Sequence, residues 1–203
     1  MELRRSIFIA IALVIALASQ AQQNVQFDLD YNIDFPAGSS FRSLVTQPAY
    51  KGFTAGFAYA FTNQLSAGLS IGYNDYYQKF PRQVYSNGPG SDISAVITNS
   101  IQQAPLLATI EYSFLKKGMI RPYVGGGAGV NFIAFDQYAG EFDNPVNYAK
   151  FALRGQAGVL IPLSRGSSTA IRVGASYNYA PLKEQGITNL NNWGVHAGIR
   201  LPL

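Results

Sequence analysis

The chain has 203 residues, of which 48% are hydrophobic and only 13% are charged, with a formal net charge of +4. The charged share is about half of that usual in soluble domains, so an ordinary soluble enzyme is a poor match. The chain has no cysteine and one histidine, which excludes disulfides and a cysteine nucleophile and leaves little material for a metal site, so neither a metal nor a cofactor is expected.

Residues 1–21 have the order of a secretory signal peptide. Arg4 and Arg5 precede an apolar run over residues 7–18, and small residues follow at Ser19 and Ala21. The run is shorter than the roughly 20 residues that a membrane-spanning helix needs. We therefore predict cleavage after Ala21 and an exported single domain over residues 22–203, with an uncleaved anchor helix as the alternative. No cysteine follows the predicted cleavage site, which excludes a lipid-anchored lipoprotein.

Residues 25–35, VQFDLDYNIDF, alternate without interruption between apolar and polar side chains. A period of two predicts a β-strand, because successive side chains point to opposite faces. In a soluble sandwich the apolar face would point into the core. In an outer-membrane barrel the apolar face contacts lipid and the polar face lines the interior. This strand alone is compatible with both folds.

Seven further segments show the same alternation. They are residues 53–61, 65–73, 106–114, 123–135, 151–161, 171–179 and 193–203. Glycines blur the pattern in residues 123–135, where we assign Val124, Ala128, Val130 and Phe132 to the lipid face. With the first strand, these segments predict eight strands.

The connections between these strands alternate in length. Residues 62–64, 115–122 and 162–168 are short, whereas residues 36–50, 74–105, 136–150 and 180–192 are long. Transmembrane barrels have short periplasmic turns and longer outer loops, and aromatic residues near both strand ends match the girdles at the bilayer interfaces. The sequence therefore predicts an all-β fold, an eight-stranded antiparallel transmembrane up-and-down β-barrel in the outer membrane of a Gram-negative cell.

Two segments carry a resemblance to a known family. RPYVGGGAGVNF, residues 121–132, resembles the glycine-rich fifth strand of the eight-stranded outer-membrane barrels of the OmpA, OmpX and OmpW type. WGVHAGIRLPL, residues 193–203, resembles their last strand, although such proteins usually end on Phe and this chain has Leu203. The resemblance implies a C-terminal signal read by the barrel-assembly machinery, formed by Val195, Ala197, Ile199, Leu201 and Leu203.

The inward-facing positions decide what the barrel interior can do, because eight strands leave just enough room for side chains to fill it. The ionisable inward residues form a candidate luminal charge network of Asp28, Asp30, Asp34, Glu111, Arg154, Arg172, His196 and Arg200. Unpaired buried charges are costly, so these groups should pair. We expect Asp28 near Arg200, Asp30 toward His196, and Glu111 at a depth similar to that of Arg154.

A paired network predicts a structural plug, and with it a non-enzymatic protein with a structural or surface-binding role. The alternative is a narrow conduit for small solutes, hydrophobic ones included, whose ion pairs rearrange. A lipid A-modifying enzyme is a further alternative. It would need a serine and an acid beside His196 at the outer rim, whereas the alternation directs His196, like Ser176, into the lumen. The GGGAG run lacks the spacing of a phosphate-binding loop.

The basic residues lie mainly in the predicted connections. Those in or beside the outer loops are Arg42, Lys51, Lys79, Arg82, Lys150 and Lys183, and those at the periplasmic turns are Lys116, Lys117, Arg121 and Arg165. This distribution predicts contact with outer-membrane lipid and lipopolysaccharide, and it gives no case for nucleic acid.

The predicted loop 74–105 is the most individual of the connections. Its residues Ile93, Val96, Ile97 and Ile101 have helical spacing that also fits a strand. Such a loop would fold over the lumen as a lid or bind a surface ligand, unless it extends the strands of its own hairpin.

Overall fold

The computed structural model describes residues 24–86, 92–115, 118–139, 142–143, 145–164, 167–184 and 187–203. The predicted signal peptide, residues 1–21, lies outside the described residues, so its cleavage stays a prediction. In the described part of the chain, no helix has the length and apolar character needed to cross a membrane.

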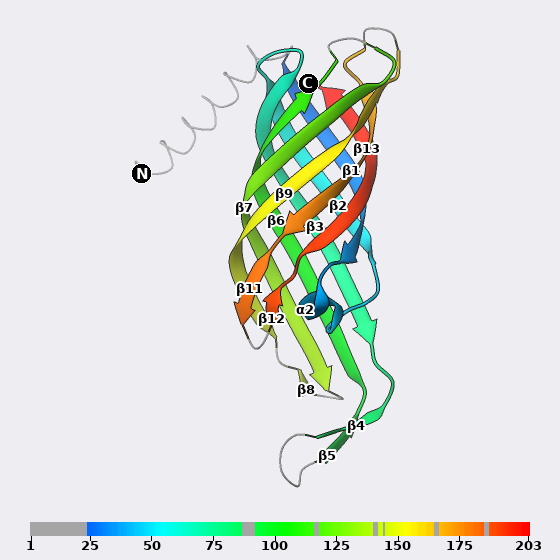
Figure 1. The fold of residues 1–203 in the computed structure, drawn as a ribbon, viewed down its shortest axis with the longest axis vertical. Coiled ribbons are helices and arrows are strands. Elements are labelled where there is room, and N and C mark those ends of the chain that lie inside the picture. The colour runs from blue at the N-terminus through cyan, green and yellow to red at the C-terminus, as the bar shows by residue number, and fades with distance from the viewer. Residues whose placement is uncertain are drawn as a thin grey trace, which may run out of the picture.

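Eight long strands of the described chain close into an antiparallel barrel (Figure 1). Each pairs with the next long strand along the chain, and the first pairs with the last. The strands are β1 (Val25–Pro36), β2 (Ala49–Ala60), β3 (Leu65–Lys79), β6 (Ile97–Ser113), β7 (Arg121–Ala139), β9 (Val146–Pro162), β10 (Ala170–Tyr179) and β13 (Asn192–Pro202). The predicted eight-stranded up-and-down barrel is confirmed.

The alternation of side chains along each strand separates the outer wall from the lumen. On β1, Tyr31 is 53% exposed, whereas its neighbours Asp30 and Asn32 are buried. On β7, Val124 and Phe132 are exposed while Tyr123 and Asn131 are buried, in agreement with the lipid face predicted for this glycine-rich strand. The apolar wall and the polar lumen thus follow directly from the period of two.

The two ends of the barrel differ. Residues 61–64, 114–120 and 163–169 connect strands at one end, which we call the turn end and which lies uppermost in Figure 1. The opposite end, which we call the loop end, carries a short helix and several short strands. These are α2 (Ser39–Arg42), β4 (Gln83–Ser86), β5 (Asp92–Ala95), β8 (Phe142–Asp143), β11 (Pro181–Glu184) and β12 (Ile187–Asn189).

The strands continue farther at the loop end than the sequence predicted. β3 runs to Lys79 and β6 begins at Ile97, so much of the predicted loop 74–105 is paired strand, and β7 and β9 likewise extend into the predicted loop 136–150. The described residues 92–103 lie in β5 and β6 apart from residue 96, so of the two conformations that the spacing allowed it is the strand that forms, as an extension of the hairpin. Beyond the bilayer the outer wall contacts water, and pairing no longer requires an apolar outer face.

A hydrophobic cluster fills the barrel at the loop end. We call it the loop-end cap; its buried members are Phe41, Val45, Ala49, Tyr76, Ile101, Ile133, Phe135, Ala180, Leu182, Ile187 and Leu190. The α2 residue Phe41 inserts toward Tyr76 of β3, and the two rings meet edge to face with centroids 4.9 Å apart. No member is more than 9% exposed, so the cap forms a small water-excluding core inside the mouth of the barrel.

Candidate functional site

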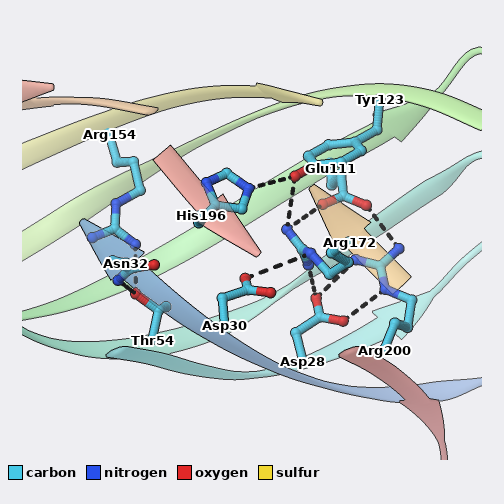
Figure 2. A network of polar contacts seen from close by, with 10 residues as sticks. All are labelled: Asp28, Asp30, Asn32, Thr54, Glu111, Tyr123, Arg154, Arg172, His196 and Arg200. Atoms are coloured by element: carbon cyan, nitrogen blue, oxygen red, sulfur yellow. Dashed lines mark hydrogen bonds and ion pairs between the residues drawn. The ribbon is translucent and has the colours of Figure 1, made fainter. Parts of the chain in front are cut away.

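A layer of charged side chains crosses the lumen nearer the turn end than the cap (Figure 2). We call it the luminal charge layer; it consists of Asp28, Asp30, Glu111, Arg172 and Arg200. Arg172 forms an ion pair with Asp28 and lies 3.3 Å from Glu111 and 3.5 Å from Asp30. Arg200 donates two hydrogen bonds to Asp28, at 2.7 and 2.8 Å, and its Nη1 lies 2.8 Å from Glu111. The two arginines therefore share two of the three carboxylates.

The strand register explains how these groups meet. Asp28 lies directly opposite Arg200 across the β1–β13 seam that closes the barrel. Gly198 is the β13 residue opposite both Asp30 of β1 and Arg172 of β10. Because Gly198 has no side chain, Arg172 can reach across β13 to the acids of β1. A Cβ atom at this position would overlap the Leu29 backbone and the Asp30 side chain.

Two aromatic rings adjoin the layer, that of Tyr123 near the turn end and that of His196 on the side of the loop end. The Tyr123 hydroxyl lies 2.7 Å from Nε2 of His196, and Arg172 donates to the same hydroxyl at 3.4 Å. The guanidinium of Arg172 also sits over the Tyr123 ring, 5.0 Å from its centroid. Sequence reasoning missed Tyr123, although its inward position two residues before the glycines of β7 was a usable signal.

Arg154 belongs to a second, mostly uncharged group. Its Nε donates to Asn178 at 2.7 Å, and its Nη1 lies within 3.4 Å of Thr54, which also accepts a hydrogen bond from Asn32. Asp34 is buried nearer the loop end and forms no ion pair within the described residues. The Asn178 amide oxygen and the Thr54 hydroxyl therefore accept from Arg154 in place of a carboxylate.

Two expected neighbours are corrected by the register. Glu111 aligns through Gly125 with Gln156, two residues from Arg154, so it pairs with Arg172 and Arg200 instead. Asp30 lies opposite Gly198, and it is Asn32 that lies opposite His196. Both expectations failed because contacts across the lumen depend on how far each strand is shifted along its neighbour, which alternation alone does not reveal.

Little free space remains within the charge layer. A cavity of about 40 Å³ adjoins it, lined by layer residues together with Thr54, Ser70 and Thr109. This volume holds about two or three water molecules. Three carboxylates face two guanidinium groups, so the layer carries one excess negative charge when all five groups are ionised.

The two residues considered for a catalytic role, His196 and Ser176, do not lie opposite each other across β10 and β13. His196 is 7% exposed and is held by Tyr123, while Ser176 lies opposite Gly194 rather than His196. In the described part of the chain, no group of three or more His, Asp or Glu side chains has the geometry to hold a metal ion.

The residues predicted as an assembly signal lie along β13. Val195, Ala197 and Ile199 are exposed on the outer wall, and Leu203 follows the end of the strand. Their outward positions agree with the alternation, and their role in assembly stays a prediction.

A second surface of interest lies on the strand extensions at the loop end. We call it the outer sheet face, formed by Tyr77 and Lys79 of β3, Thr98 and Ser100 of β6, and Tyr138 of β7. Tyr77 pairs with Ser100, and Lys79 and Tyr138 both pair with Thr98. Tyr77 is 53% and Tyr138 is 40% exposed, and Asp136 of β7 lies opposite Ser100 on the same face, so the face presents aromatic, hydroxyl and carboxylate groups beside Lys79.

The comparisons with known proteins agree with this architecture. Residues 7–200 match the outer membrane protein beta-barrel domain family. No curated protein matches the chain in sequence. Neisserial surface protein A (NspA) is similar in structure, with 19% identity, a TM-score of 0.52, and coverage of 88% of this chain and 96% of that one. OprG from Pseudomonas aeruginosa has 13% identity and a TM-score of 0.52, covering 88% and 95%. At these identities the two likenesses show the fold alone.

Proposed function

Because the chain belongs to the outer membrane protein beta-barrel domain family, and is thus an integral barrel of the outer membrane, we propose that it works as a sealed, non-enzymatic barrel. Its interior serves stability, and its loop-end surface makes the functional contacts. The observation that carries this proposal is that two different layers, the loop-end cap and the luminal charge layer, fill the lumen in series.

The two layers block a pore by different physical means. The cap excludes water, since its side chains are almost completely buried. The charge layer occupies the lumen on the turn-end side of the cap, with three carboxylates joined to two guanidinium groups. A solute would have to open the apolar core and also separate buried ion pairs, each step costing several kcal/mol by the usual scale of such contacts.

The outer sheet face supports a surface-binding role. Lys79 is six positions beyond the girdle residue Tyr73 on β3, which places it roughly 15 Å farther from the bilayer at about 3.3 Å per residue and a tilt of about 40°. This height matches the lipopolysaccharide headgroup region. A lysine flanked by tyrosines and hydroxyls suits sugars and phosphates, so we propose lipopolysaccharide as the ligand of this face.

Export through the signal peptide and recognition of β13 by the barrel-assembly machinery complete the proposal. The outward row of Val195, Ala197 and Ile199 gives that machinery an accessible, regular feature. Burial of His196 inside the lumen supports the non-enzymatic role, because a lipid substrate would have to pass through the wall to reach it.

Single-channel recording in a planar bilayer tests the seal. The refolded barrel, with insertion verified, should produce no step openings. Steady openings whose size changes in a Glu111→Gln variant would contradict the sealed barrel and favour the conduit.

Binding to vesicles that contain lipopolysaccharide tests the surface role. Lys79→Gln should weaken binding more than Lys51→Gln, an equal charge change on β2 opposite Asp75 of β3. Equal effects of both substitutions would show that general charge, rather than the outer sheet face, is responsible.

A further inference from the structure

The turn end of the barrel opens into a cavity that the proposed function does not use. The cavity measures about 490 Å³, and we call it the turn-end vestibule. This volume is within the range of roughly 300–1,000 Å³ that small-molecule sites occupy. Its lining consists of Asn24, Gln26, Ala60, Phe61, Thr62, Asn63, Gln64, Leu65, Ser66, Ser113, Arg121, Leu160, Ser168 and Arg200.

The charge on the vestibule wall has one sign. Its lining includes two arginines, Arg121 and Arg200, and no Asp or Glu. Asp28 and Glu111, the carboxylates closest in the network, are paired with Arg200 and do not line the vestibule. The connecting segments 61–64, 114–120 and 163–169 also contain no acidic residue in their sequence. An anion would therefore meet no opposing carboxylate on entering.

Arg121 is the residue with unused binding capacity. It forms no ion pair or side-chain hydrogen bond within the described residues, and its Nε is buried without a partner. The Nε–H of this partly exposed arginine loses its hydration without compensation. A bound anion would supply the missing acceptor, and Arg binds phosphate well because its planar fork matches two oxygens.

Neutral polar groups line the vestibule together with Arg121. The buried Oε1 of Gln26 also has no partner, and the amide can turn to donate its N–H groups instead. Ser66 and Ser113 line the vestibule with hydroxyl groups that can donate as well. A phosphate has several acceptor oxygens, so this set of donors fits it better than a cation.

The vestibule also reaches the lipid-facing side of the wall. Phe61 lines it and is at the same time 61% exposed, and the nearby turn residues Met119, Ile120 and Leu163 are exposed and apolar. In outer-membrane barrels the short turns lie at the periplasmic interface. A headgroup from the surrounding phospholipid leaflet can therefore enter beside Phe61.

We propose that the turn-end vestibule is a phosphate-binding site, with Arg121 as its main ligand and the headgroup of an anionic phospholipid as the source of the phosphate. Free phosphate from the periplasm shares the same chemistry, and the experiment below separates the two sources. The site shares Arg200 with the luminal charge layer and lies at the opposite end of the barrel from the outer sheet face.

The test is a titration of the refolded barrel in nonionic detergent with short-chain phosphatidylglycerol, followed by ³¹P NMR. A parallel titration uses inorganic phosphate. Arg121→Gln should weaken binding of phosphatidylglycerol about tenfold, equivalent to about 1.4 kcal/mol, whereas Arg121→Lys should weaken it less because the positive charge remains. Arg82→Gln, an exposed arginine near the loop end, is the matched control and should bind as the unaltered barrel does.

The fold of each variant is checked by the heat-dependent shift of its mobility on a denaturing gel. If the barrel binds phosphatidylglycerol but not inorganic phosphate, and Arg121→Gln weakens this binding, the lipid headgroup is the source of the bound phosphate. Binding of inorganic phosphate with the same dependence on Arg121 identifies a site for free phosphate. Absence of binding by both probes, or equal losses in folded Arg121→Gln and Arg82→Gln, overturns the proposal.

Discussion

Replacement of Arg172 by glutamine is the most informative perturbation of the lumen. Arg172 contacts all three carboxylates of the luminal charge layer and the hydroxyl of Tyr123. Glutamine is shorter and uncharged, so it can keep at most one of these contacts, as a neutral hydrogen bond. The layer would then hold three carboxylates against one guanidinium group, that of Arg200, which changes its net charge from −1 to −2.

The expected loss of stability follows from these contacts. The Coulomb attraction between two opposite charges about 4 Å apart is about 4 kcal/mol at an effective dielectric constant of 20. Most of that attraction offsets the cost of removing the guanidinium from water. Removing one partner of a buried ion pair costs about 3–5 kcal/mol in practice, because the remaining charge stays buried. We expect Arg172→Gln to lower the free energy of unfolding by this amount.

Urea unfolding in phospholipid vesicles measures the effect. Trp193 is the only tryptophan of the chain and stacks on Phe35, with ring centroids 4.3 Å apart, so its fluorescence reports the β1–β13 seam. Arg82→Gln is the control, and as an exposed substitution it should change stability by less than about 0.5 kcal/mol. Adding Asp30→Asn to Arg172→Gln returns the layer to a net charge of −1 and should recover about 1 kcal/mol or more.

Two results would refute this reasoning. A loss below about 1 kcal/mol in Arg172→Gln would mean that water in the lumen already solvates the charges, as it does at exposed ion pairs. Absence of recovery in the double variant would mean that Arg172 acts through packing on Tyr123 rather than through charge.

Three other substitutions test separate parts of the structure. Phe41→Ala removes an aromatic ring from the loop-end cap and should cost about 3–5 kcal/mol in the same unfolding assay; a cost near zero would show that the cap is loosely packed. Tyr123→Phe removes the partner of His196 Nε2 and should cost about 1–3 kcal/mol, with a changed His196 ring signal in NMR; an unchanged signal would contradict the contact. Gly198→Val places a side chain where Arg172 crosses β13 and should abolish the heat-dependent gel shift of the folded barrel; a retained shift would show that β1 moves away to make room.

The sequence was sufficient to predict the barrel because lipid imposes a strict pattern on its wall. Within the bilayer every outward position must be apolar, so the period of two identified all eight strands. Beyond the bilayer that requirement ends. The segment from Ile97 to Gln103 has polar residues on its outer face. Alternation of apolar and polar residues therefore predicts a loop there, although the segment is part of β6. For the same reason, the strands predicted over residues 123–135 and 151–161 are shorter than β7 and β9.

The luminal residues were predictable as a set, whereas their partners were not. Alternation directs Glu111, Arg154 and Arg172 inward, yet the shift between strands decides that Glu111 meets Arg172 instead of Arg154. The loop-end cap was missed for a related reason. Its members Phe41, Tyr76 and Leu182 are far apart in the chain, and only the closed barrel brings them together.

The pairing of β1 with β13 has a consequence for the order of folding. Asp28 and Arg200 are 172 positions apart, and they meet only when the first and last strands join. Contacts between such distant residues form slowly, because a long loop must close before they provide any stabilisation.

Until that moment the acids of β1 lack the Arg200 of β13 as a partner, and an open sheet would carry them unneutralised into the membrane. Neutralisation of the lumen and completion of the cylinder are therefore a single late event. A partly assembled sheet remains high in free energy, which favours all-or-none insertion over the accumulation of half-built intermediates.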